Sequence, residues 1–313
     1  MKIKKLAKYI TNSDYRFLVD VAHGKYRSLP DDIFLKRKYK AIFGKELNLE
    51  CPTSFNEKLQ WLKLYYRDPA YTVMVDKYLV RDYIAKTISE EVLIPLIDAW
   101  EDPHDIVFER LPNEFVLKCN HNSGLGMYIC HDKSSINKKK VIQDLCKGLR
   151  QDYYSITKEW PYKNVKRKVI CEKLIINEND AMEPLDDYKV MVFNGKVRII
   201  EHHKGRFTNH YTQDFYDQDW NKLNLSQAIA GDPTSNSVSS KPAHLAEMIA
   251  YSERIAGNLP YLRVDWYDVN DTLYFGEITF FDGGGYVKWD TDEMDNYVGS
   301  LLNLEGCSLG DYR

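Results

Sequence analysis

The stretch that most constrains the fold is LRVDWYDVNDTLYFGEITFFDGGGY, residues 262–286. Two runs rich in β-branched and aromatic residues flank the polar turn DVND, a pattern typical of a β-hairpin. Such a hairpin brings Asp265 and Glu277 to the same end of neighbouring antiparallel strands. Two carboxylates held side by side in this way predict an oxygen-ligand site for a hard cation.

The rest of the chain has the composition of a soluble intracellular protein. Its 313 residues can bury a substantial core in one large domain or in two to three lobes. No apolar run approaches the roughly 20 residues that a membrane span requires, and the opening MKIKKLAKYI lacks the features of a signal peptide. The six cysteines form no C-x-x-C motif, so we expect reduced, packed thiols.

Charge is unevenly distributed along the chain. Residues 110–173 contain 14 Lys and Arg against 6 Asp and Glu, whereas residues 174–313 contain 11 against 23. A basic segment followed by an acidic one could grip a polyanion and hold its metal ions. The alternative is ordinary solvated surface, which composition alone favours.

Periodicity predicts helices first and strands later. Thr53-x-x-Asn56 resembles a capping box before one helix, and YTVMVDKYLVRDYIAKTISEE predicts another. EVLIPLIDAW is a short extended segment, and strands are expected in NEFVLKCN, MYICH and KRKVICEKLI. Serines are expected to cap the helix in SSINKKKVIQDLCKGLRQDYY. Asn194-Gly195 predicts a hairpin turn, and a further helix should end at Gly257.

Two further patterns point to a nucleotide. Lys118 ends an apolar strand and precedes Ser123, Gly124 and Gly126, a turn able to lay backbone N–H groups against phosphate oxygens. Glu172 and Lys173 close the next strand, where free edge groups could bind adenine, and Glu178 or Asp180 a ribose. Neither pattern is specific by itself, and single polar residues of this kind are more often surface than ligand.

The order of these patterns resembles the ATP-grasp fold, and Arg-x-Asp followed by Glu-x-Thr is close to the corresponding strands of D-alanyl-D-alanine ligases. A tighter resemblance is to the TupA-like ATP-grasp proteins, a family encoded in bacterial cell-surface polysaccharide loci. The blocks that carry it span residues 54–286: SFNEKLQWLKLYYRD, VDKYLVRDYI, LIPLIDAW, FVLKCNHNSG, EWPYKNVKRKVICEKLI, DYKVMVFNGKVRII, YDQDWN and RVDWYDVNDTLYFGEITFFDGGGY.

The resemblance implies an α+β ATP-grasp fold in which two lobes clamp ATP. A helical N-terminal region would cover residues 1–110, the small nucleotide-gripping lobe 111–175, and the large lobe with the metal-binding hairpin 176–313. It also implies an ATP-dependent carboxylate–amine ligase of capsule or O-antigen synthesis. Such an enzyme forms an acyl phosphate and joins an amino acid or amine to an acidic sugar on a glycan precursor.

The resemblance further implies ATP and Mg²⁺ as cofactors and a role for each candidate residue. Lys118 and Lys189 would hold phosphates, and Arg263 would stabilise the transferred group. The nucleotide would contact Ser123, Gly124, Gly126, Glu172, Lys173, Leu174 and Glu178; Mg²⁺ would bind Asp265, Glu277 and, more weakly, Thr279, where the ligases have Asn; substrate would contact His121, Asn122, Arg206, Asp282, Gly283 and Gly284.

The sequence also leads to expectations about the location of the protein and its partners. We expect a cytoplasmic bacterial protein without a nucleic-acid partner, with peripheral contact of its basic N-terminus to the inner membrane as an option.

Asp217-x-Asp219 has the spacing with which many glycosyltransferases bind a metal and a sugar nucleotide, but no nucleotide-binding βαβ half precedes it. A sugar kinase on the same scaffold would use the same lysines and metals, and a binding module without catalysis would leave Arg263 unexplained.

Overall fold

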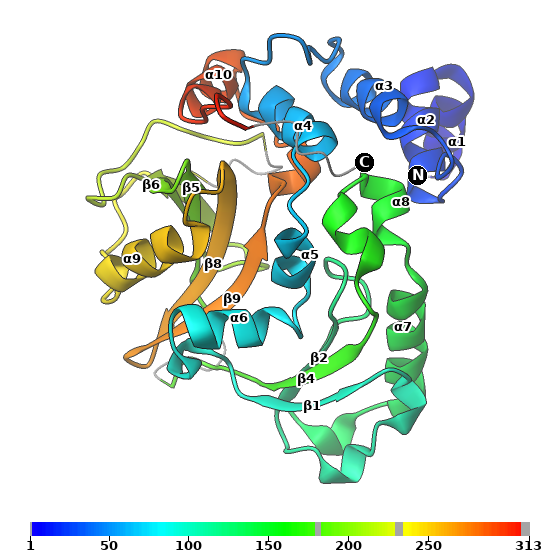
Figure 1. Cartoon of the computed structure of the whole chain (residues 1–313). Coiled ribbons are helices and arrows are strands. Elements are labelled where there is room, and N and C mark those ends of the chain that lie inside the picture. Colours follow the sequence, from blue (N-terminus) through cyan, green and yellow to red (C-terminus); the bar gives the residue numbers. More distant parts are fainter. Residues whose placement is uncertain (1, 179–182, 229–233, 308–313) are drawn as a thin grey trace.

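The computed structural model describes residues 2–178, 183–228 and 234–307, which form two antiparallel sheets with surrounding helices (Figure 1). The helices are α1 (Lys2–Thr11), α2 (Ser13–Ala22), α3 (Asp31–Phe43), α4 (Phe55–Tyr65), α5 (Ala70–Val75), α6 (Val80–Thr87), α7 (Lys138–Arg150), α8 (Tyr153–Thr157), α9 (Leu245–Ala256) and α10 (Asp292–Ser300). The strands are β1 (Leu96–Trp100), β2 (Phe115–Cys119), β3 (Tyr128–Cys130), β4 (Val169–Lys173), β5 (Asp187–Phe193), β6 (Lys196–Lys204), β7 (Thr212–Tyr216), β8 (Tyr261–Val269) and β9 (Thr272–Thr279).

The larger sheet has the strand order β7-β6-β5-β8-β9. Every residue of its central strand β5 is buried, as expected for a strand covered on both faces. Helix α9 contacts β5, β6 and β8, and Phe55 at the start of α4 packs its ring 5.1 Å from that of Tyr261. The main hydrophobic core therefore lies around this sheet.

The smaller sheet has the order β1-β4-β2-β3 and lies across the bottom of Figure 1. Helix α7 packs on β2, and together they enclose a second core that includes Phe115, Leu117 and Leu145. Strand β1 lies within residues 1–110, yet it pairs with β4 and so extends this sheet. The domain boundaries at residues 110 and 175 stay predictions.

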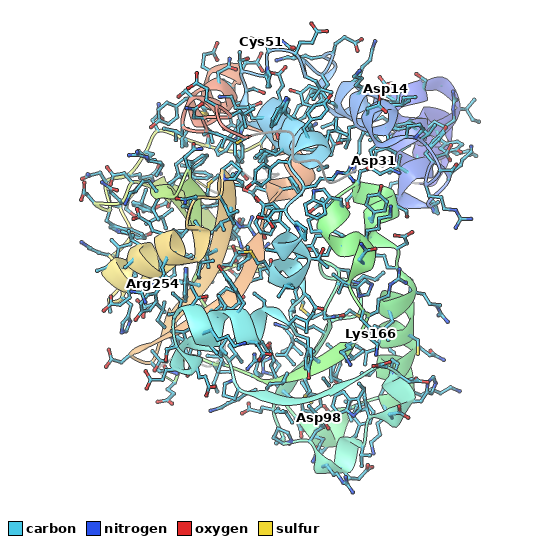
Figure 2. The ribbon with its side chains drawn as sticks, in the orientation of Figure 1. Asp14, Asp31, Cys51, Asp98, Lys166 and Arg254 are labelled. Carbon is cyan, nitrogen blue, oxygen red and sulfur yellow. The ribbon has the colours of Figure 1, made fainter. Side chains whose placement is uncertain are left out.

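The helices α2 and α3 enclose a third, smaller core around Phe17, Phe34 and Leu35. Asp31 joins this unit to α8, because the Tyr154 hydroxyl donates to its Oδ1 over 2.8 Å and the Lys158 ammonium lies 3.4 Å away. Figure 2 labels Asp31 at this junction. The N-terminal helices are thus attached to the segment that follows the small sheet's helix α7.

Most predicted elements are present. The Asn194-Gly195 turn joins β5 to β6 with φ of 47° and 76°, and Gly257 ends α9. The six cysteines are free thiols, of which Cys119, Cys130 and Cys171 are buried as predicted and Cys51 is exposed. No helix in the described ranges is long and apolar enough to cross a membrane.

Three local predictions were wrong. The capping box of α4 uses Ser54 and Glu57 instead of Thr53 and Asn56. Asn137 caps α7, whereas the preceding serines lie in a short 3-10 turn. The single helix expected over residues 71–91 is two helices, α5 and α6, since the chain leaves helical geometry at Asp76.

Candidate active site

The predicted hairpin is formed by β8 and β9, and Asp265 lies directly opposite Glu277. Asn270 and Asp271 make the turn with φ of 52° and 56°. The register shifts by one residue just after Asp265, opposite Gly276. A Cβ at Gly276 would lie 3.0 Å from the Asp265 carbonyl oxygen, so glycine allows the irregularity that brings the two acids level.

These acids continue a row of charged residues across the large sheet. Glu201 on β6 pairs with Lys189 on β5, Lys189 pairs with Asp265 on β8, and Asp265 pairs with Glu277 on β9. The Lys189 ammonium lies 2.6 Å from Asp265 Oδ2 and 2.8 Å from Asp187 Oδ2. Burial lowers the pKa of Lys189, but the surrounding carboxylates outweigh this effect and raise it, so the side chain is cationic.

Arg263 is the central donor of the site. Its Nε and one terminal nitrogen contact the two Asp265 oxygens at 2.7 and 2.8 Å, and its other terminal nitrogen contacts Asp282 Oδ1. It also donates to Thr279 Oγ1 over 3.3 Å. Burial disfavours the charge of Arg263, yet Asp265 and Asp282 together raise its pKa well above the ordinary value. The guanidinium is therefore fixed in orientation as well as charge.

Lys118 and Glu172 form the corresponding pair on the small sheet. The Lys118 ammonium lies 2.6 Å from Glu172 Oε2, and Arg81 of α6 lies 3.2 Å from Glu172 Oε1. Glu172 is buried, whereas 19% of the Lys118 side chain is exposed. A buried carboxylate thus holds Lys118 at the strand end that precedes the glycine turn.

Lys77 connects the two sheets, and the sequence interpretation missed it. It follows Asp76, where the helix breaks, and its ammonium lies 3.1 Å from Glu277 Oε2 and 3.0 Å from the Asn122 carbonyl oxygen. Burial raises the pKa of Glu277, but Lys77 and the other nearby cations lower it overall. Asp76 Oδ1 accepts hydrogen bonds from the Tyr78 backbone N–H and from the Asn120 side-chain amide, both over 2.8 Å. Aspartate is a residue type that often precedes a new helix, and this was the signal that could have revealed the break.

The glycine turn between β2 and β3 is anchored on α7. Gly124 has a φ of +80° and no atom within 4 Å of a Cβ position, whereas a Cβ at Gly126 would lie 2.9 Å from Gly148 Cα. Ser123 and Gly124 are exposed. The first part of the predicted phosphate turn is therefore exposed, whereas Gly126 packs against α7 and its contact with the nucleotide stays a prediction.

His121 and Asn122, predicted to contact substrate, bind backbone carbonyls in the structure. His121 Nε2 lies 3.1 Å from the Gln151 oxygen, and the Asn122 amide donates to the Gly148 oxygen over 3.2 Å. Burial lowers the pKa of His121 to about 4, so the ring is neutral. Both side chains hold the turn against α7, and their contact with substrate stays a prediction.

The segment after β4, predicted to hold the nucleoside, runs toward the hairpin turn. Lys173 is exposed and Leu174 is half-buried. The Glu178 backbone N–H donates to Asn270 over 3.0 Å. Asp180 lies outside the described residues. Arg206 lies 3.2 Å from Asp187, and its role in binding substrate stays a prediction.

Asp282 begins a left-handed turn in the 3-10 segment η6 (Asp282–Gly285). Gly283 and Gly284 have φ of 54° and 67°, values that favour glycine. Asp282 is 4% exposed. Burial raises its pKa, whereas Arg263 opposes the rise. The turn lies directly beside the Arg263 donor network, and its predicted contact with substrate is untested.

Asp217 has a structural role. Its Oδ1 accepts hydrogen bonds from the Asp219 and Asn221 backbone at 2.9 and 2.8 Å, and its Oδ2 accepts from the Asn221 amide at 2.9 Å. Asp219 is exposed. The Asp-x-Asp pattern thus forms the turn after β7, which weakens the glycosyltransferase interpretation.

The donor set fits a magnesium ion that is bound together with phosphates. Asp265 and Glu277 offer oxygens, while Asp187 Oδ1 and Asp282 Oδ2 are buried without a hydrogen-bond partner in the described chain. No group of three or more His, Cys, Asp or Glu arranged to hold a metal occurs in residues 2–178, 183–228 and 234–307. Mg²⁺ commonly binds one or two carboxylates and takes its remaining ligands from water and substrate phosphates.

Solved structures to which the chain is similar include two D-alanine–D-alanine ligases and a ribonucleotide synthetase. The D-alanine–D-alanine ligase from Bacillus anthracis complexed with ATP is 19% identical with a TM-score of 0.37, and the match covers 66% of this chain and 54% of that one. The Helicobacter pylori enzyme of the same name is 14% identical with a TM-score of 0.41, covering 80% and 70%. N5-carboxyaminoimidazole ribonucleotide synthetase from Thermus thermophilus is 14% identical with a TM-score of 0.40, covering 72% and 51%.

Two of these alignments span little more than half of the solved protein. No curated protein matches the chain. A family model described as TupA-like ATPgrasp matches residues 57–303, most of the chain. This match, together with the two-sheet α+β architecture, confirms the predicted fold: the chain belongs to the TupA-like ATP-grasp family.

Proposed function

We propose that this protein is an ATP-dependent carboxylate–amine ligase that releases ADP. The observation that carries the proposal is the row Lys189, Asp265 and Glu277 across adjacent strands, with Arg263 fixed on Asp265. Phosphoryl transfer depends on positioned cations more than on a strong base. The row provides such cations, because Asp265 holds both Lys189 and Arg263 in place. Membership of an ATP-grasp family supports the same conclusion.

In this proposal the cations of both sheets hold the triphosphate. Lys118 from the small sheet and Lys189 from the large sheet would contact phosphate oxygens, and the open part of the turn at Ser123 and Gly124 would donate backbone N–H groups. Lys77 would be a third cation near the phosphates, because its ammonium contacts both Glu277 and the carbonyl oxygen of Asn122. The nucleoside would lie along Glu172 to Leu174, with Glu178 at the ribose.

Asp265 and Glu277 would hold Mg²⁺, with Thr279 as a weaker third ligand. When bound, the ion would neutralise phosphate charge. Lys77 and Arg263 keep Glu277 ionised by lowering its pKa against the opposing effect of burial. Its side chain is 35% exposed, compared with 4% for Asp265, so Glu277 is the more accessible carboxylate.

The reaction proceeds in two balanced steps. A substrate carboxylate oxygen bonds to the γ-phosphorus while the bond to the bridging oxygen breaks, which gives an acyl phosphate and ADP. An amine then attacks the acyl carbon, phosphate leaves with the bonding pair, and the amine loses a proton. Arg263 and Lys189 would stabilise the oxygens that gain charge, because both are fixed by Asp265.

The substrates follow from the family resemblance. We propose an acidic sugar on a glycan precursor of capsule or O-antigen as the carboxylate, and an amino acid or amine as the acceptor. A sugar kinase remains the alternative, since phosphorylation of a hydroxyl would use the same lysines and carboxylates. A glycosyltransferase centred on Asp217 is disfavoured by the turn in which that side chain is bound.

We also propose that the protein acts in the cytoplasm with its helix α1 on the inner membrane. Leu6 and Ile10 are 61% and 65% exposed, and Lys5 and Lys8 lie on the same short helix. Co-sedimentation with phosphatidylglycerol vesicles, but not with phosphatidylcholine vesicles, is expected. Leu6→Glu should abolish it, whereas Ile33→Glu, at a site 51% exposed on α3, should not.

ADP release tests the proposed activity. The purified protein is incubated with MgATP, glucuronate or galacturonate, and hydroxylamine as a general amine. A ligase releases ADP over repeated turnovers only when acid and amine are both present, whereas a kinase needs no amine and a glycosyltransferase releases no ADP from ATP. Asp265→Asn and Glu277→Gln should each abolish turnover with unchanged circular dichroism. Full activity in both variants would remove the role proposed for the two carboxylates.

A further inference from the structure

We infer that a buried polar stripe on α4, formed by Asn56, Gln60 and Lys63, positions Asp282 and through it Arg263 for the reaction. The inference rests on the proposed function. It assigns a catalytic purpose to the helix in which the family match begins, far in sequence from Arg263 and Asp282. The stripe consists of positioning residues, since its hydrogen bonds go to protein groups: the backbone of residues 284–287, the Thr157 carbonyl oxygen and the Asp295 side chain.

The stripe is unusual because it is polar and buried at the same time. Its residues lie four and three positions apart, so they share one face of α4. Asn56 and Gln60 are 0% exposed and Lys63 is 1% exposed. Burying an amide or an ammonium costs free energy unless it is hydrogen-bonded. The partners of these side chains therefore explain why they are there.

All three side chains bind the backbone of residues 284–287. The Asn56 amide donates to the Val287 oxygen and its own oxygen accepts from the Val287 N–H, both over 2.8 Å. The Gln60 amide donates to the Gly285 oxygen over 2.6 Å, and the Lys63 ammonium to the Gly284 oxygen over 2.7 Å. This segment follows β9 and has left the sheet, so α4 supplies hydrogen bonds that a neighbouring strand would otherwise provide.

The turn held in this way begins at an active-site residue. Asp282 directly precedes the glycines and receives a hydrogen bond from Arg263. The Gly284 N–H donates to the Phe281 oxygen over 2.7 Å, which closes the turn around Asp282. A Cβ at Gly285 would lie 2.4 Å from the Gln60 amide nitrogen. Helix and turn are in close contact, so a shift of the turn is expected to move Asp282 and the Arg263 fork.

Glu159 compensates the charge of Lys63 from the other side of the turn. Burial lowers the pKa of Lys63 and raises that of Glu159, each to about 7, while each group opposes the effect on the other. A Cβ at Gly284 would lie 3.5 Å from Glu159 Oε1. Lys63 and Glu159 therefore both lie close to Gly284, and each is 3% exposed or less.

The same helix provides a matched control. Lys58 also donates to backbone oxygens, those of Gly299 at 2.9 Å and Leu302 at 2.7 Å. These oxygens lie at the end of α10, not in the turn after β9. Lys58→Met thus removes a comparable contact of α4 without touching residues 284–287. Gln60→Leu is the test variant, because Gln60 Oε1 has no partner in the described chain and its loss removes an unsatisfied group.

Two measurements test the inference on the full chain. Hydrogen exchange of peptides covering residues 281–288 and 261–268 should be accelerated at least about tenfold in Gln60→Leu and unchanged in Lys58→Met. ADP release with uronate and hydroxylamine should show a kcat reduced by about tenfold or more with KM for ATP within threefold, since a small misplacement of catalytic groups affects the chemical step more than binding. The double variant Lys63→Met with Glu159→Gln, which removes both charges of this pair, should behave like Gln60→Leu.

Three results would overturn the inference. They are a normal kcat in Gln60→Leu, an equal loss in Lys58→Met, and accelerated exchange at 281–288 that does not extend to the Arg263 peptide. Should the wild type release no ADP with any acid and amine, the proposed function fails, and the exchange of the two peptides still decides whether α4 positions Arg263.

Discussion

Replacing Arg263 with methionine tests whether the buried charges of the site depend on one another. Arg263 is 8% exposed and makes the two contacts with Asp265 and the contact with Asp282. Asp265 keeps Lys189 at 2.6 Å. Asp282 loses the hydrogen bond to its Oδ1, and its Oδ2 already has no partner in the described chain. Breaking a buried pair in this way costs about 3–5 kcal/mol of unfolding free energy.

That loss is large beside the roughly 5–15 kcal/mol that stabilises a folded domain. With a urea slope of roughly 3 kcal/mol/M, the unfolding midpoint should fall by about 1 M or more. Arg198→Met on β6 is the control, because Arg198 is exposed on the same sheet; its midpoint should change little. The double variant Arg263→Met with Asp282→Asn should recover part of the loss, since the uncompensated charge is gone.

The loss of unfolding free energy in Arg263→Met should also depend on pH. Burial already raises the pKa of Asp282 and Arg263 opposes it, so the variant's Asp282 should have a still higher folded pKa. A carboxyl with a raised folded pKa contributes stability that is present below its unfolded pKa of about 3.9 and lost as pH rises through the folded value. The difference between wild type and variant should therefore be smaller at pH 5 than at pH 8. A difference below about 1 kcal/mol, or one that does not change with pH, would refute the reasoning.

Three further predictions concern the ligands and the glycine turn. Lys118→Ala should weaken ATP binding in calorimetry by tenfold or more, the equivalent of the roughly 1.5–3 kcal/mol of a charged hydrogen bond; unchanged affinity would separate Lys118 from the phosphates. Mg²⁺ alone should bind weakly and MgATP much more tightly, because the described chain offers no group of three acidic or imidazole ligands; tight binding of the free ion would contradict this. Gly126→Ala should lower the thermal midpoint more than Gly124→Ala does, since only the first meets Gly148 and Cys119 within 3 Å while both positions have positive φ; equal shifts would show that packing on α7 is unimportant.

The parts of the site that the sequence predicted depend on local signals. Asn194-Gly195 and the DVND turn identify two hairpins, and pairing within the second brings Asp265 to Glu277. Lys118 was identified because a glycine turn follows its strand. In each case a turn residue lies within a few positions of the candidate side chain. The local sequence alone therefore determines where this side chain lies relative to the turn.

The parts that were missed depend on contacts between distant segments. Lys77 sits in what periodicity alone describes as the middle of one helix, and its partner Glu277 is two hundred positions away. Asn56, Gln60 and Lys63 have the residue types of a solvated helix face, yet they are buried because the turn after β9 accepts their hydrogen bonds. Residue type predicts exposure only when the hydrogen-bond partner is water.

The cations of the site are already paired within the protein. Lys118 is held by Glu172, Lys77 by Glu277, and Lys189 by Asp265. Each pairing fixes a flexible side chain and offsets its desolvation, so the cations need little reordering when a nucleotide binds. In the proposed complex, phosphate must therefore compete with a carboxylate for each ammonium. Mg²⁺ bound to Glu277 and Asp265 would free the ammonium groups of Lys77 and Lys189 to bind phosphate. We therefore expect ATP to bind most tightly together with Mg²⁺.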